Sequence, residues 1–150
     1  MRLNGTAVVG VAAVALLLMA VPSLAGERVS GPGFDGVVVA GQGRERWMPT
    51  RREIMELEGA LPPDTRSAWS ERKITSPRRL SEYKRQYIGR MQGQKRLIHV
   101  TFLHNSTDSV RSGEWLQRVS GVVGGGDMYL YADYDADAKV LLSLAINSAR

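Results

Sequence analysis

Few residues in this chain have side chains suited to catalysis. Its 150 residues include no cysteine and two histidines, His99 and His104. A chain without cysteine has no disulfide, no thiolate-bound metal and no cysteine nucleophile. The two histidines are five positions apart, so on one strand they would point to opposite faces and could not share a metal ion. No G-x-S-x-G or H-E-x-x-H motif occurs. We therefore predict neither a catalytic site nor a cofactor.

Three alternating aspartates, Asp133, Asp135 and Asp137, resemble the start of a calcium-binding loop. That loop requires glycine and glutamate farther on, where this chain has Ala138 and Leu144. Aspartates also favour tight turns, because their side chains bond the local backbone. We interpret the three as turn residues, and weak calcium binding stays open as the alternative.

Gln117, Val119 and Gly121 fit the Q-x-V-x-G pattern of cystatin protease inhibitors. In that family the segment forms a hairpin tip that enters the active-site cleft of papain-type proteases. An N-terminal glycine and a later Pro-Trp hairpin complete the inhibitory wedge. In this chain no proline follows Pro77 and no tryptophan follows Trp115. The resemblance implies protease inhibition as one alternative function.

Positive charge is concentrated between Glu71 and Arg96, where nine basic residues stand against two acidic ones. A concentrated positive surface attracts polyanions. If the loop before the first long strand folds back over it, four bases form a candidate anion-binding patch: Arg78, Arg79, Lys84 and Arg90. The competing interpretation, which we favour from the sequence alone, is a solvated surface. Nucleic acid is not an expected partner, because Tyr83 and Tyr87 are assigned to the core and exposed rings for stacking are few.

The first 25 residues have the pattern of a secretory signal peptide. Arg2 precedes an uncharged apolar run from 7 to 21, and Ser23-Leu24-Ala25 supplies small residues before Gly26. The run is shorter than the roughly 20 residues of a membrane-spanning helix. We expect cleavage after Ala25 and export to the periplasm or the medium, with no transmembrane segment in the mature chain.

The mature chain is expected to hold a flexible, glycine-rich segment at 26–48 and a single domain at 49–150. Thr50 and Glu53 fit a capping box at the start of a helix, and Pro62-Pro63 ends that helix. Trp47 lies three residues before the cap, and we expect it to fold back on the apolar stripe of the helix.

From position 80 onward, apolar residues recur with a period of two, which is typical of strands. Two such runs flank Gly93-Gln94, and a two-residue turn would pair odd positions of the first run with even positions of the second. That register places six apolar side chains on one face: Tyr83, Tyr87, Met91, Ile98, Val100 and Phe102. Further strands are expected at 115–122, 128–134 and 140–146.

The expected fold is α+β, with one N-terminal helix packed on an antiparallel meander of about five strands. This element order resembles that of cystatin-like folds. Several segments also resemble a group of small exported bacterial proteins of unknown function: Trp47-x-Pro49, Leu57-Glu58-x-x-Leu61, Tyr83-x-Arg85-Gln86-Tyr87-x-Gly89, Tyr134-Asp135 and Ala145-Ile146-Asn147. The resemblance implies the same fold and export, and it brings no activity with it.

Together these features predict an exported, non-enzymatic domain that binds an unidentified protein or an anionic component of the envelope. Two alternatives stay open. One is an enzyme or enzyme subunit with a cleft that sequence spacing does not reveal, such as a pair of carboxylates. The other is a cystatin-type protease inhibitor.

Overall fold

The computed structural model describes residues 26–40, 47–122 and 124–147. The expected signal peptide and residues 41–46 of the expected flexible segment lie outside them. The described chain forms one sheet of six strands, which follow one another in sequence order across the sheet. Its strands and α-helices are β1 (Arg28–Gly31), β2 (Phe34–Val38), α1 (Arg51–Ala60), β3 (Tyr83–Gln92), β4 (Lys95–His104), α2 (Asp108–Ser112), β5 (Tyr129–Asp135) and β6 (Val140–Ile146).

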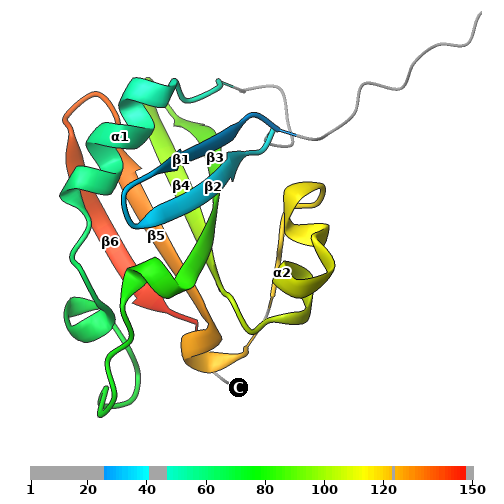
Figure 1. Cartoon of the computed structure of the whole chain (residues 1–150). Helices are drawn as coiled ribbons and strands as arrows, with labels where there is room; N and C mark the ends of the chain where they lie inside the picture. Colours follow the sequence, from blue (N-terminus) through cyan, green and yellow to red (C-terminus); the bar gives the residue numbers. More distant parts are fainter. Residues whose placement is uncertain (1–25, 41–46, 123, 148–150) are drawn as a thin grey trace, which may run out of the picture.

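The sheet is mixed. β2 and β3 run parallel, whereas the other neighbouring strands are antiparallel. A parallel pair needs a crossover connection, and α1 lies in that connection and covers one face of the sheet (Figure 1). We call this the helix face. The segment 105–122, which contains α2, packs on the opposite face through Trp115, and we call that the far face.

The prediction of an N-terminal helix on a five-stranded antiparallel meander is wrong. Two strands, β1 and β2, precede α1 in a region that was expected to be flexible. The glycines there serve a hairpin: Gly33 adopts a φ of +78° in its turn, and Gly36 leaves room for the ring of Tyr87. Phe34 and Val38 are buried in the main core. The parallel pairing of β2 with β3 joins residues about fifty positions apart, and no local pattern encodes it.

Gly26 packs directly against β2. An added Cβ at this position would collide with the carbonyl oxygen of Val38. Beside it, the N–H of Val38 donates to the carbonyl of Glu27 (2.8 Å). The described chain is therefore held to the sheet from its first residue.

α1 begins as the sequence predicts. The Thr50 side chain accepts a hydrogen bond from the Glu53 N–H, and the Glu53 carboxylate accepts one from the Thr50 N–H. This capping box satisfies amide donors that have no partner within the helix. Trp47 packs against the main core. Its indole N–H donates to the Arg90 carbonyl (3.0 Å), which ties the start of α1 to β3.

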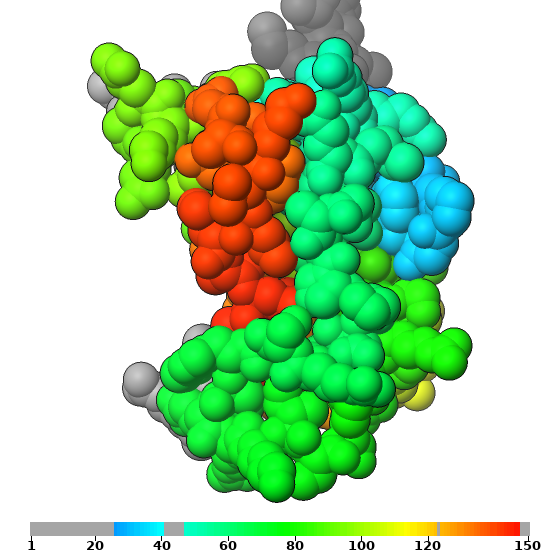
Figure 2. Space-filling view, turned by 90° about the vertical axis from the view of Figure 1, so that its left-hand side faces the viewer, coloured from blue at the N-terminus to red at the C-terminus, as the bar shows by residue number. Residues whose placement is uncertain are grey.

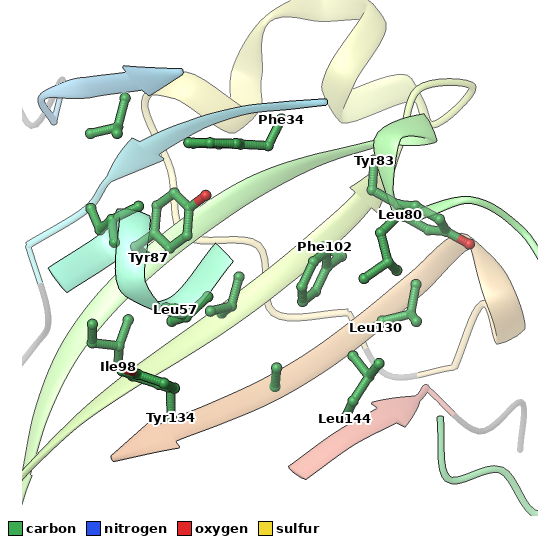
Figure 3. Packing of buried hydrophobic residues seen from close by; sticks show 14 of the residues in the cluster. Phe34, Leu57, Leu80, Tyr83, Tyr87, Ile98, Phe102, Leu130, Tyr134 and Leu144 are labelled. Atoms are coloured by element: carbon green, nitrogen blue, oxygen red, sulfur yellow. The ribbon is translucent and has the colours of Figure 1, made fainter. Parts of the chain in front are cut away.

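The β3–β4 hairpin has the predicted register. Tyr87 pairs with Val100 and Gly89 with Ile98 around the Gly93-Gln94 turn. Odd positions of β3 and even positions of β4 therefore share the helix face. Phe102 is fully buried there, and Figure 3 shows it in the core with Tyr83 and Leu130 nearby.

The strand predicted at 115–122 is wrong, because these residues form a 3₁₀ turn, Glu114–Leu116, followed by a loop. The Gln86 side chain on β3 donates to the carbonyls of Trp115 (2.5 Å) and Arg118 (2.6 Å) and accepts from the Ser120 N–H (2.8 Å). Backbone polar groups that are removed from water need partners. Here one buried side chain supplies the partners that strand pairing would otherwise provide.

The last two predicted strands are confirmed as β5 and β6, which form an antiparallel pair. The pairing register shifts between Asp133 and Tyr134. β6 is an edge strand, and its end is bridged by Trp69, which pairs with Ala145. Within the described residues, no helix has the length and apolar character to cross a membrane.

Candidate functional site

A charged pair is buried on the helix face between α1 and β3. Arg85 donates from Nε to Glu58 Oε1 (3.2 Å) and from Nη2 to Glu58 Oε2 (3.4 Å). The Tyr87 hydroxyl donates to Glu58 Oε1 (2.6 Å). The side chains of Arg85 and Glu58 are only 3% and 10% exposed. We call these three residues the Glu58 network.

The surroundings of Arg85 complete this network. Its Nη1 donates to the carbonyl of Tyr83 (2.5 Å). Its guanidinium lies over the rings of Phe34 (5.9 Å) and Phe102 (5.4 Å), in the geometry of cation–π contacts. Burial and the neighbouring Glu58 carboxylate raise the pKa of Tyr87 far above its ordinary value. The Tyr87 hydroxyl therefore keeps its proton and remains a donor. The network fixes α1 to β3.

From the sequence alone, Arg85 is one of nine bases in a positive segment, and no role is predicted for Glu58. A signal was nevertheless present, because position 85 lies between Tyr83 and Tyr87 and must share their face on a strand. A base on an apolar strand face needs an acidic partner. Glu58 follows Leu57, at the border of the apolar stripe of α1, and is such a partner.

A groove of about 460 Å³ opens beside the Glu58 network. Pro32 and Gly33 of the β1–β2 turn, the residues that follow α1 and residues 79–81 form its walls. The charged residues that line it are of both signs: Glu58, Asp64, Arg79 and Arg85. Glu58 and Arg85 neutralise each other, and Asp64 is paired with Arg66.

The far face carries a second polar cluster, on β4, β5 and β6. His99 Nδ1 pairs with Asp133 Oδ1 (2.9 Å), and the His99 ring stacks on Tyr131 at 5.7 Å between centroids. The hydrogen bond from His99 lowers the pKa of Asp133. The other oxygen of this carboxylate, Oδ2, accepts a hydrogen bond from Ser143 (3.4 Å). Asp133 therefore lies between the histidine and the serine, which is not the order that activates a serine nucleophile.

The second histidine is used elsewhere. His104 Nδ1 bonds Ser106 Oγ (2.7 Å) at the end of β4, and its Nε2 lies 3.4 Å from Glu82 Oε2. The two histidines thus take part in separate contacts.

The structure spreads out the four bases of the candidate anion patch: Arg78, Arg79, Lys84 and Arg90. Arg78 Nε pairs with Asp127 Oδ2 (2.7 Å), and Lys84 Nζ pairs with Asp35 Oδ2 (2.7 Å). Arg78 and Arg79 precede β3, whereas Arg90 lies near its far end. Lys84 and Arg90 share the far face but are six residues, or about 20 Å, apart.

A cavity of about 260 Å³ lies at the end of the molecule where Arg78 is held. Figure 2 shows the segment between α1 and β3 in green, filling this end beneath β6. Residues from three segments line the cavity: Thr65 and 70–76, Gly126 and Asp127, and Ile146 and Asn147. We call the segment 65–79, together with the Gly126–Met128 turn and Asn147, the basic end.

The basic end carries an excess of positive charge. Residues 65–79 include five bases and one acid, Glu71, and the Gly126–Met128 turn adds a second acid, Asp127. Two of the bases, Arg72 and Lys73, line the cavity and are exposed. Neither forms an ion pair with any residue that the structure describes. Arg78 is held in place by Asp127 and by a hydrogen bond from its N–H to Thr65 Oγ1 (3.0 Å).

The inhibitor-like residues Gln117, Val119 and Gly121 lie in the loop that Gln86 holds against the far face. All three are exposed. The segment is a loop between two 3₁₀ turns rather than the tip of a hairpin.

The three aspartates of the β5–β6 region have separate partners. Asp133 bonds His99, and Asp135 Oδ1 accepts from the N–H groups of Asp137 and Ala138. Asp137 pairs with Arg96 (2.7 Å). In the described part of the chain, no three histidine, cysteine, aspartate or glutamate side chains come together as a metal site.

The chain was compared with protein families, curated proteins and solved structures. No protein-family model, no curated protein and no solved structure matches the chain.

Proposed function

We propose that this chain is an exported, non-enzymatic domain that binds an anionic component of the envelope through its basic end. The observation that carries the proposal is the pair Arg72 and Lys73. Both line the cavity, and neither forms an ion pair with an acidic residue that the structure describes. Glu71 and Asp127 also line the cavity, but Asp127 is already paired with Arg78, so an anion at the basic end would meet a net positive charge.

The fixed position of Arg78 supports the same proposal. Its ion pair with Asp127 joins the loop before β3 to the turn before β5. Asn147, at the end of β6, donates to the carbonyls of Val122 (2.8 Å) and Gly124 and so ties down the chain on the other side of the cavity. A pre-ordered site loses less conformational entropy when it binds a ligand.

The buried chemistry of the molecule supports a binding role over a catalytic one. Glu58, Arg85 and Tyr87 are bonded to one another, and His99 is bonded to Asp133. These contacts join strands to each other or to α1, so they serve the fold. The bases that are left for an outside partner are the exposed ones.

A soluble polyanion tests the proposal. Heparin carries dense negative charge and no lipid, so it reports electrostatic binding alone. We expect the mature protein to bind heparin at low salt and to lose most of that binding by about 0.5 M salt, because exposed charges are screened beyond about 10 Å already at 0.1 M. The double variant Arg72→Glu/Lys73→Glu should lower the affinity at least tenfold, and titration calorimetry would measure it.

A matched charge reversal separates a site from a net-charge effect. Arg90 and Lys95 are also exposed, but they lie by the β3–β4 turn, at the opposite end of β3 from Arg78. The variant Arg90→Glu/Lys95→Glu changes the net charge by the same amount and should bind heparin nearly as well as the wild type. Equal losses in the two double variants would contradict the proposal, as would no heparin binding at low salt.

A further inference from the structure

Trp69 is the most exposed of the large apolar side chains in the described chain, at 61%. Its backbone is nevertheless well ordered. The Trp69 N–H donates to the Leu144 carbonyl (2.8 Å), and the Ile146 N–H donates to the Trp69 carbonyl (2.9 Å). The indole is therefore displayed from the edge of the sheet on a fixed backbone.

Trp69 belongs to the basic end and lies beside its cavity. Ser70, which follows Trp69, lines the cavity. Ile146 lines it too, and it follows Ala145, the residue that Trp69 bridges. Within four positions of Trp69 along the chain lie three bases, Arg66, Arg72 and Lys73, and one acid, Glu71. Arg66 keeps its side chain 77% exposed while it pairs with Asp64.

A tryptophan beside several bases fits one kind of anionic surface well. Tryptophan concentrates at membrane–water interfaces, because its ring is apolar and its N–H is polar. Lysine and arginine next to such a ring gain from the negative potential of anionic lipids. A soluble polyanion would satisfy the bases and leave the indole in water. The combination therefore favours a lipid surface over a soluble polymer.

We propose that the basic end docks on an anionic lipid bilayer, with the Trp69 indole at the level of the headgroups and Arg66, Arg72 and Lys73 on the lipid phosphates. This inference rests on the proposed function and names its partner. Binding is peripheral: the contact consists of one ring and a few charges.

Tryptophan fluorescence of the wild-type protein tests the inference directly. Of the three tryptophans, Trp115 is buried and Trp47 is half-buried with its N–H bonded to Arg90. Trp69 is therefore the one able to change its surroundings on docking. We expect a blue shift of the emission with vesicles of phosphatidylglycerol and phosphatidylcholine, and quenching when brominated lipids are used. Vesicles of phosphatidylcholine alone should cause neither change.

Substitutions separate the lipid contact from the charge contact. Trp69→Ala keeps both backbone hydrogen bonds, and circular dichroism would verify its fold. We expect Trp69→Ala to lower vesicle affinity about tenfold in co-sedimentation, as removal of a buried aromatic anchor would, and to leave heparin binding unchanged. Val119→Ala, at an exposed apolar residue of the far-face loop, should change neither the vesicle affinity nor the heparin binding.

The outcomes distinguish the two proposals. Heparin binding without a vesicle-induced emission shift, or with vesicle affinity unchanged in Trp69→Ala, would overturn the lipid inference and leave the proposed function standing. Absence of both heparin and vesicle binding would overturn both.

Discussion

At the scale of single residues, Arg85 is a charged side chain within the main core. It is almost fully enclosed and bonded to Glu58 on the neighbouring helix. Removing one partner of such a pair leaves the other charge buried without compensation, at a cost of about 3–5 kcal/mol. We predict that Arg85→Met lowers the free energy of unfolding by this amount in a urea titration.

A second substitution tests the cause of that loss. In Arg85→Met/Glu58→Gln no buried charge remains, and the glutamine still accepts the hydrogen bond from Tyr87. The double variant should therefore regain at least half of the stability lost in Arg85→Met. If the effects of the two substitutions on the unfolding free energy were simply additive, the stability lost in Arg85→Met would come from packing and not from the unpaired Glu58 carboxylate.

Asp35 should make the protein sensitive to acid. The hydrogen bond from Arg28, helped by Lys84, lowers the pKa of Asp35 to about 2. Its pKa in the unfolded chain is about 3.9. The stabilisation is thus complete above about pH 4 and is lost as the pH falls toward 2, because the unfolded state binds the proton first. We predict that Asp35→Asn flattens the fall of the unfolding free energy over this interval. Parallel pH curves for the two proteins would contradict the assignment.

At the scale of elements, the β3–β4 hairpin has the main core on its helix face, whereas its far face has a smaller apolar cluster and the His99–Asp133 pair. Phe102 lies on the helix face and is fully buried, whereas His99 lies on the far face and is bonded to Asp133. We predict that Phe102→Ala costs about 3–5 kcal/mol of unfolding free energy, as large-to-small core substitutions do. His99→Ala should cost clearly less by the same denaturant titration. Equal costs would mean that the far-face cluster is as important to stability as the core.

At this scale, the sequence predicts those helices and strands whose signals come from residues close together in the chain. The capping box of α1 and the turn of the β3–β4 hairpin depend on residues within a few positions of each other, and both are confirmed. β1 and β2 depend on pairing with a strand about fifty positions later, and glycines made the region look flexible. The segment 115–122 has apolar residues typical of a strand, but its backbone bonds the Gln86 side chain and not a neighbouring strand.

The same reasoning applies to the candidate site. Composition pointed to a basic region between positions 71 and 96, and exposed bases do gather at the basic end. It did not show that Arg78 and Lys84 already have acidic partners, because Asp127 and Asp35 each lie 49 positions away. Trp69 received no role, since the exposure of a single loop residue depends on the tertiary structure.

At the scale of the whole molecule, the proposed export would place the basic end near the anionic lipids of the envelope. We predict that the native mature protein begins at Gly26, which N-terminal sequencing would determine. The small residues before Gly26 fit the cleavage site of a signal peptide. Membrane-bound protein that still begins at Met1 would contradict this prediction.

The packing of Gly26 sets an order of events for that maturation. A protease that cuts between Ala25 and Gly26 must hold the residues around the bond in an extended, accessible form. In the finished fold Gly26 lies against Val38 with no room for even a methyl group, and Glu27 is bonded to the same residue. If the chain is cleaved at this bond, as we predict, the cut has to come before β1 closes on β2. In that case the pairing of β1 with β2 would depend on prior removal of the leader, and the uncleaved precursor would lack this part of the sheet.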